Sequence, residues 1–151
     1  MAGTVEQRLV ELGIELPEPV APAANYVRSQ ITGNLLFIAG TGPAADIKKG
    51  KVDSEVSVEE AYQAARSVGL QILATAQAAL GSLDRITKTV KVLGMVNADP
   101  DFEKHPQVIN GCSDLLVEVL GEAGRHTRSA VGFGSLPNRI AVEIEATFEV
   151  E

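Results

Sequence analysis

The stretch Val142-Glu-Ile-Glu-Ala-Thr-Phe-Glu-Val150 decides the fold, because its residues alternate without a break between apolar and polar. This period of two is typical of a β-strand with one face in a core. Upstream, residues 128–133 predict a partner strand, and the turn-forming residues 134–138 predict that the two strands form a closing hairpin. One arm would carry Arg128 and the other a row of carboxylates. Together they suit a site that binds a small carboxylate and moves a proton.

Outward from this strand, the chain predicts three helices, a long strand and an opening hairpin. Ser57-Val-Glu-Glu60 has the spacing of a capping box, and Gly81 is a favoured helix stop. Gly33-Asn34 between two apolar runs predicts a hairpin turn. The expected elements are a helix at 5–14, strands at 25–31 and 35–40, a helix at 57–80, a strand at 84–97 and a helix at 106–120.

Both long helices must cover the same apolar sheet face, which predicts an α+β fold: a two-layer sandwich of a mixed β-sheet with two helices on one face. The other face is expected to bear Thr87 and Thr89 with the glutamates of the last strand. Strand 84–97 becomes apolar on both faces at Leu93 and Met95, which predicts that another surface, such as a second subunit, covers it there. Residues 1–20 are expected to form an N-terminal helix and lead-in, and residues 21–151 a single domain.

Composition limits the function classes. The net charge is −7 and the Lys48–Lys51 segment holds the only basic cluster, so nucleic acid is not an expected partner. No apolar stretch approaches the roughly 20 residues that span a bilayer, and no secretory signal is visible. A cytoplasmic protein without a membrane partner is therefore expected. The lone Cys112 excludes an internal disulfide and a thiolate cluster, and the sequence offers no metal-binding spacing.

Two residue types could carry chemistry. The Arg128 guanidinium presents a planar fork that matches the two oxygens of a carboxylate. The alternative is that it pairs with a glutamate at the protein surface. Glu143 and Glu145 share one strand face, and either could act as a general acid or base if enclosed, or could simply be solvated. Tyr26, Asn110 and the Gly40-Thr41 step could add hydrogen bonds and close backbone approach to a ligand.

His126 could titrate near neutrality or be an ordinary loop histidine. Cys112 lies in the packing stripe of its helix, which indicates a core residue rather than a nucleophile. The chain has no nucleophile elbow, Walker loop or dinucleotide-binding motif. Any catalysis is therefore expected to be acid–base and electrostatic, with no metal and no cofactor.

These residues resemble a known family. Arg128-Ser-Ala-Val, Leu136-Pro and Val142-Glu-Ile-Glu-Ala are similar to the C-terminal signature of the Rid family (YjgF, reactive intermediate deaminase, L-PSP endoribonuclease-like). Asn25-Tyr-Val-Arg with Gly33-Asn-Leu-Leu-Phe-Ile-Ala-Gly40 resembles its opening hairpin, and the segment from Ser82 to Val92 its third element. The resemblance covers roughly residues 20 to 150 in order.

The resemblance implies a chorismate-mutase-like fold and a homotrimer with clefts between subunits. It also implies cofactor-independent deamination of small 2-imino or enamine acids. Arg128 would bind the substrate carboxylate and Glu143 would position or activate water. Tyr26, Gly40 and Asn110 would line the pocket.

Some features depart from the family pattern. His126 and Ala130 stand where the deaminases usually have proline and cysteine, and the N-terminal helix and the 121–126 loop are additions. These departures indicate a divergent, longer subgroup. The alternatives are a non-catalytic module that binds small carboxylates as a sensor or chaperone, and an endoribonuclease, against which the negative charge argues. A chorismate-type isomerase is suggested by fold alone, and fold does not assign function.

Overall fold

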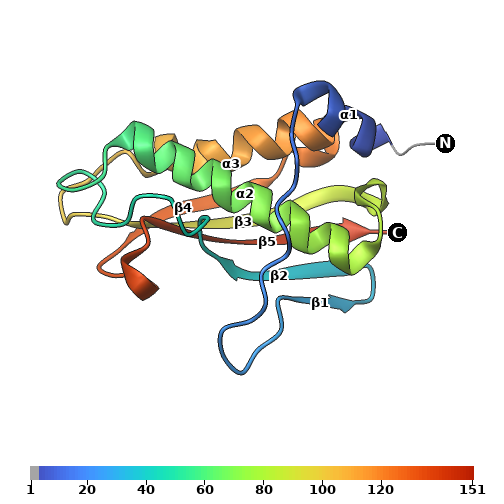
Figure 1. The fold of residues 1–151 in the computed structure, drawn as a ribbon, viewed down its shortest axis with the longest axis horizontal. Helices are drawn as coiled ribbons and strands as arrows, with labels where there is room; N and C mark the ends of the chain where they lie inside the picture. The colour runs from blue at the N-terminus through green and yellow to red at the C-terminus, as the bar shows by residue number, and fades with distance from the viewer. Residues whose placement is uncertain (1–3) are drawn as a thin grey trace.

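The computed structural model describes residues 4–151, which form a five-stranded mixed sheet with helices on one face (Figure 1). The strand order is β1-β2-β5-β3-β4, and only β3 and β4 run parallel. The predicted α+β class is thereby confirmed. The elements are α1 (Thr4–Leu12), β1 (Ser29–Thr32), β2 (Leu35–Thr41), α2 (Val58–Leu80), β3 (Ile86–Asn97), α3 (His105–Leu120), β4 (Thr127–Phe133) and β5 (Val142–Val150).

The helix α2 begins and ends where local chemistry dictates. The Ser57 hydroxyl accepts from the Glu60 amide at 3.1 Å, and the Glu60 carboxylate accepts from the Ser57 amide at 3.0 Å. This capping box satisfies two amides that the first turn would leave unpaired. The helix stops at Gly81, whose φ of 82° favours glycine. A side chain at Gly111 of α3 would collide with the Tyr62 carbonyl of α2, so this glycine lets the two helices pack closely.

The strand β5 lies at the centre of the sheet, between β2 and β3. Its alternation is confirmed, because Val142, Ile144 and Phe148 are fully buried while Glu145 is exposed. Burying one such side chain contributes about 1.5–3 kcal/mol, so this strand is a main source of stability. The predicted opening hairpin is also confirmed: β1 and β2 pair across Gly33-Asn34, with Thr32 opposite Leu35. Its first strand is shorter than predicted, because β1 begins at Ser29 rather than at residue 25.

The predicted closing hairpin is wrong, because β4 and β5 are not neighbours. The chain leaves β3, passes through α3 and returns as β4, parallel to β3, with Arg128 opposite Val92. Both edges of β3 are then filled, by β5 and β4. Residues 134–141 carry the chain past the end of β3, where the Asn97 amide donates to Ala141 and its side chain to Ile140. The turn-forming residues serve this longer connection equally well.

The placement of Thr89 on the open face is also wrong. The register between β3 and β5 shifts between Thr89 and Lys91, so Thr89 lies opposite the buried Phe148. Thr89 is 1% exposed, and its hydroxyl donates to the Ala123 carbonyl at 2.8 Å. A β-bulge resets the alternation of a strand, and a simple period of two does not reveal it.

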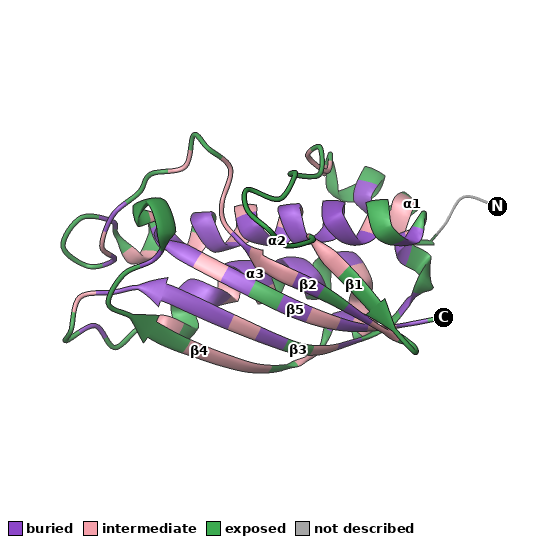
Figure 2. Cartoon of the chain, turned by 90° about the horizontal axis from the view of Figure 1, so that it is seen from below, coloured by how far each residue is buried: buried purple, intermediate pink, exposed green. Residues whose placement is uncertain are grey.

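Figure 2 shows the sheet from the face that the helices leave open. The strand register places an apolar area on this face, beside the glutamates of β5. Leu93 lies opposite Glu145 and Met95 opposite Glu143. Phe37, Val131 and Phe133, on the same face, are 40–43% exposed. Large side chains left so accessible favour a covering surface. That the surface is another subunit remains a prediction.

The N-terminal helix α1 is anchored beside the start of β3. The Asp84 carboxylate accepts from the amides of Thr4 and Val5, both at 2.9 Å, and Leu9 is buried. The helix ends at Leu12, two residues before the predicted end, because Gly13 adopts a φ of 67°. The lead-in then runs down across α2 to β1 (Figure 1). No helix within residues 4–151 is long and apolar enough to cross a membrane.

Candidate functional site

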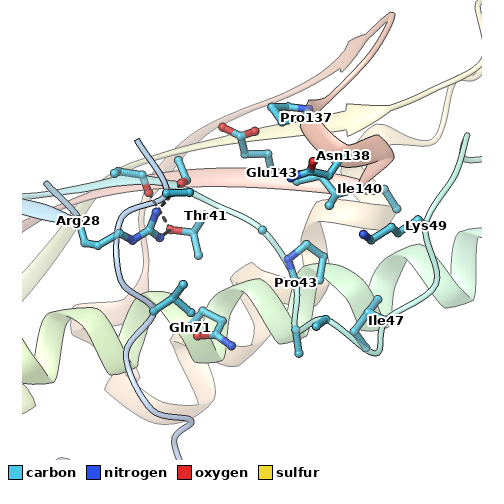
Figure 3. A pocket seen from close by; sticks show the side chains of 18 of the residues that line it. Arg28, Thr41, Pro43, Ile47, Lys49, Gln71, Pro137, Asn138, Ile140 and Glu143 are labelled. Atoms are coloured by element: carbon cyan, nitrogen blue, oxygen red, sulfur yellow. Dashed lines mark hydrogen bonds between the residues drawn. The ribbon is translucent and has the colours of Figure 1, made fainter. Parts of the chain in front are cut away.

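A hollow beside the end of β2, here called the Glu143 pocket, has a volume of about 700 Å³ (Figure 3). Its walls come from the lead-in, the end of β2, the loop after β2, α2 and the connection before β5. Tyr26, Gly40 and Glu143, which were predicted as site residues, all line it. The volume lies within the range of small-molecule sites.

Glu143 lies directly against Gly40. A Cβ at position 40 would collide with the Glu143 carboxylate, so glycine is needed there for the acid to occupy this position. Partial burial raises the pKa of Glu143, and the nearby Glu145 charge raises it further, while the Arg28 charge opposes both. A carboxyl group with a raised pKa accepts and releases a proton more readily near neutrality, as a general base requires.

Arg28 braces this wall of the Glu143 pocket, and sequence reasoning missed it. Its Nη1 donates to the Tyr26 hydroxyl at 3.1 Å and to the Gly40 carbonyl at 3.2 Å. Its Nη2 donates to the Thr41 hydroxyl at 2.8 Å. Arg28 therefore fixes two predicted pocket residues at once. The available signal was its position two residues after Tyr26, since alternate residues of an extended segment share a side.

A smaller hollow, here called the Arg128 pocket, has a volume of about 360 Å³ and lies between α3 and β4. Arg128 Nη1 donates to the Asn110 side-chain oxygen at 2.8 Å and to the Ser113 hydroxyl at 3.0 Å. Ser113 was missed, although it lies three residues after Asn110 and therefore on the same helix face. The two contacts fix the guanidinium at the edge strand of the sheet, and they engage Nη1 alone.

His126 completes this hydrogen-bond chain. Its Nδ1 lies 2.6 Å from the Gly124 carbonyl, and its Nε2 lies 2.9 Å from the Ser113 hydroxyl. A carbonyl only accepts, so Nδ1 carries the proton, and in the neutral ring Nε2 accepts from Ser113. The Ser113 lone pairs are thereby directed at Arg128. Burial lowers the pKa of His126 below its ordinary value, and the Arg128 charge lowers it further.

We expect His126 to be neutral at pH 7, with Nδ1 protonated. A group whose pKa is lowered by folding contributes stability above its unfolded pKa of about 6.5, and this contribution is lost as the pH falls through the folded pKa. The histidine ¹⁵N resonances followed against pH provide the measurement, with His126→Gln as the assignment control. A midpoint above the ordinary histidine value would contradict the arrangement.

The predicted site residues fall into two groups within one chain. Tyr26, Gly40 and Glu143 meet in one pocket, while Arg128 lines the other and Asn110 accepts a hydrogen bond from it. Glu143 lies opposite Met95 on the open face, whereas Arg128 lies opposite the buried Val92 and bonds to α3 on the helix face. The sheet therefore separates the two groups in a single protomer.

The single cysteine lies in the core, away from both pockets. Cys112 is fully buried, and burial raises the pKa of its thiol to about 12, so it stays protonated in the core. Within residues 4–151 no three histidine, cysteine, aspartate or glutamate side chains lie close enough to hold a metal ion. The expectation of no cofactor stays a prediction.

Comparison with known proteins identifies the family. The family model described as "YjgF/chorismate mutase-like, putative endoribonuclease" matches residues 6–141. The chain belongs to this family. This Rid-family protein is 42% identical to Protein TCP17 of Trypanosoma cruzi, over 99% of this chain and 96% of that protein.

Two solved structures resemble this Rid-family protein over nearly its whole length. Atu1372 of Agrobacterium tumefaciens, a protein of unknown function, is 44% identical with a TM-score of 0.89, over 97% of this chain and 92% of that one. A putative endoribonuclease of Shewanella oneidensis is 34% identical with a TM-score of 0.93, over 98% of this chain and 100% of that one. These relatives therefore share the fold over nearly the whole chain, including the N-terminal addition. Their descriptions do not establish an activity for this protein.

A more distant relative has been solved with a small ligand. TdcF of E. coli, with bound serine, is 21% identical with a TM-score of 0.61, over 89% of this chain and 94% of that one. At this identity the likeness shows the shared fold alone.

Proposed function

We propose that this Rid-family protein is a homotrimeric, cofactor-independent hydrolase that deaminates small 2-imino or enamine acids in clefts between subunits. The observation that carries the proposal is the division of the site. One chain holds a fixed arginine on the helix side of its sheet and a partly buried glutamate on the open side. Each half is incomplete, and a symmetric ring of protomers places different surfaces of neighbouring copies in contact.

The Arg128 half of the site supplies binding. Nη1 is held by Asn110 and Ser113, and Nη2 and Nε make no hydrogen bond among the described residues. Two parallel donors of a guanidinium match the two oxygens of a carboxylate. A substrate carboxylate held there would orient the adjacent imine carbon, and such orientation can contribute several kcal/mol.

The Glu143 half supplies proton transfer. Its carboxylate takes a proton from water while the water oxygen bonds to the electrophilic imine carbon. The proton then passes to the nitrogen and gives a carbinolamine. Its hydroxyl proton moves through the Glu143 carboxylate to the nitrogen as the C–N bond breaks, so ammonia leaves as the carbonyl forms. The balanced reaction is R–C(=NH)–COO⁻ + H₂O → R–C(=O)–COO⁻ + NH₃. An enamine enters the same sequence after a proton is added to its β-carbon. General acid–base help of this kind is worth about 10²–10⁴-fold.

The open sheet face supports the trimer. Phe37, Val131 and Phe133 are 40–43% exposed there, beside Leu93 and Met95. Covering this area with neighbouring protomers would bury apolar surface at about 25 cal/mol per Å². It would also bring the open face of one copy, with Glu143, close to the sheet edge of another, with Arg128.

The test is turnover of 2-iminopropionate generated in situ, followed as release of ammonia and pyruvate. We expect the protein to accelerate release well beyond spontaneous hydrolysis, without added metal or cofactor. No acceleration would end the proposal. Sedimentation of the same sample must give a trimer, because a monomer could not join the two pockets.

A non-catalytic carboxylate-binding module is the second candidate. The observation that favours it is the same pair of Arg128 donors without a hydrogen-bond partner among the described residues, which can bind a carboxylate whether or not water attacks. Calorimetric binding of short 2-oxo acids together with no turnover of any imine would support it. RNA cleavage that survives repurification and disappears in Arg128→Ala would instead support an endoribonuclease, against the net charge of −7.

A further inference from the structure

We propose that the apolar part of the Glu143 pocket binds the side chain of the substrate, so that this protein selects 2-imino acids with a branched or extended apolar side chain over 2-iminopropionate. The inference rests on the proposed function in one respect: the reacting carbon is taken to lie beside Glu143. It adds the side chain of the substrate, which the proposed reaction leaves open, and the residues that would contact it.

One apolar wall of the Glu143 pocket comes from the segments that follow β2 and precede β5. Pro43 and Ile47 lie after β2, and Ile140 lies before β5. Ile140 lies directly against Gly42, because a Cβ at position 42 would come within 3.1 Å of the Ile140 side chain. Figure 3 shows Pro43, Ile47 and Ile140 on the same side of the pocket, away from Arg28. These three side chains therefore gather at one end of the pocket.

Hydrogen bonds hold the segment after β2 in place. The Ala44 amide donates to the Ser67 hydroxyl of α2 at 2.9 Å, and the Ile47 amide donates to the Ala44 carbonyl at 3.1 Å. The turn is thus closed on itself and attached to α2. A wall that is already fixed needs little ordering when a ligand enters, which favours binding.

The lead-in supplies another wall, through three small apolar side chains: Val20, Ala21 and Ala23. It is held at both ends, by α1 docked on Asp84 and by the Tyr26 hydroxyl, which accepts from Arg28. Val20 is 52% exposed. An apolar ligand group in the pocket would cover part of this surface, and removing apolar surface from water is favourable.

The cations that line the pocket are either engaged within the protein or exposed to solvent. Arg28 directs its hydrogen bonds at Tyr26 and at the end of β2. Lys48 and Lys49 are exposed, and the Lys48 ammonium pairs with Glu60 at 3.4 Å. The apolar walls thus offer the larger part of the surface that a substrate side chain would contact.

The size of the pocket indicates how large this side chain is. A three-carbon acid would leave most of the roughly 700 Å³ unfilled. Small-molecule sites usually enclose most of the surface of their ligand. A branched four-carbon side chain on the same acid would fill more of the pocket and would reach its apolar walls.

The experiment is calorimetric binding of three stable 2-oxo acids to the intact protein: pyruvate, 4-methyl-2-oxopentanoate and 2-oxoglutarate. We expect 4-methyl-2-oxopentanoate to bind about tenfold more tightly than pyruvate, because three further apolar carbons leave water. It should also bind more tightly than 2-oxoglutarate, which has the same main-chain length but ends in a charge that apolar walls cannot solvate. Any other order of affinities, or no binding of these acids, would overturn the proposal.

Two matched pairs of variants locate the contact. Ile140→Ala and Val20→Asp should each lower the affinity for 4-methyl-2-oxopentanoate and leave that for pyruvate unchanged, which also reports an intact fold. Ile31→Ala and Val10→Asp change exposed residues outside the pocket and should keep the preference. A preference that survives in both pocket variants would overturn the assignment to these walls.

The proposed hydrolysis and the side-chain contact fail separately. Turnover of 2-iminopropionate together with equal affinity for pyruvate and 4-methyl-2-oxopentanoate would reject the side-chain contact alone. An intact preference for the branched acid without turnover of any imine would reject the hydrolysis alone.

Discussion

Arg128→Ala is expected to lower kcat/KM for 2-iminopropionate by about 10²–10³-fold, the largest effect among the variants considered. The change removes the carboxylate anchor, and losing one partner of a hydrogen-bonded charge pair costs about 2–5 kcal/mol. Steady-state kinetics on 2-iminopropionate measure the loss. KM should rise as well as kcat fall, because the guanidinium holds the substrate before and during the reaction.

Two matched variants test the specificity of this effect. Arg125→Ala removes an exposed arginine from the same pocket and should retain near wild-type activity. Arg128→Lys keeps the charge and loses the fork, so it should recover only part of the activity. An Arg128→Ala protein as active as wild type would contradict the anchor.

Mixing two variants of low activity tests whether the site is shared. Arg128→Ala and Glu143→Gln chains, unfolded together and refolded in equal amounts, would form mixed trimers. If Arg128 of one protomer works with Glu143 of another, roughly a quarter of the sites regain both residues. If both residues acted within one chain, no site would recover. Activity in the mixture well above that of either variant alone is the expected result.

The sequence predicted most elements of the fold because their signals are local. The alternation of Val142–Val150, the capping box at Ser57 and the turn at Gly33 each depend on a few neighbouring residues, and all three are confirmed. The pairing of β4 could not be predicted in the same way. Its position beside β3 is set by the α3 crossover, and the residues 134–138 suit a hairpin and a longer connection alike. The bulge at Thr89 is likewise a property of the pairing with β5.

The candidate site was predictable only in part. Family resemblance pointed to Arg128 and Glu143, but whether they meet between protomers stays a prediction. Arg28 and Ser113 act by fixing those residues, and their roles depend on distances that no spacing rule gives. Supporting groups such as these become visible when the elements are placed together.

Glu143→Gln is expected to lower kcat for 2-iminopropionate by about 100-fold, the second large effect. The glutamine side chain keeps the shape of Glu143 and its contact with Gly40. Its carboxamide cannot take a proton from water. KM should change little, because Arg128 still holds the carboxylate. Rates near wild type in this variant would assign the proton transfer to another group.

The pH dependence distinguishes proton transfer from a structural role. Since burial and then Glu145 raise the pKa of Glu143 from its ordinary 4.5, the acid limb of kcat/KM should lie above that value. Glu145→Gln is the matched control, because this neighbour is exposed and two residues along the same strand. It should keep full activity at neutral pH and shift the acid limb downward, since the repulsion that raises the pKa of Glu143 is gone. An acid limb unmoved by this change would contradict the assignment.

Unfolding measurements give an independent readout of the same group. A carboxyl group whose pKa is raised by folding stabilises the protein most below its unfolded pKa, and this contribution is lost as the pH rises through the folded pKa. At pH 7 the ionised Glu143 therefore opposes folding, and Glu143→Gln should be more stable than wild type by ~0.5 kcal/mol, a small value because solvent screens a partly exposed group. The difference should vanish near pH 4, where both proteins are neutral at this position. A variant that loses activity while gaining stability at pH 7 has lost a functional group, because a structural defect would lower both.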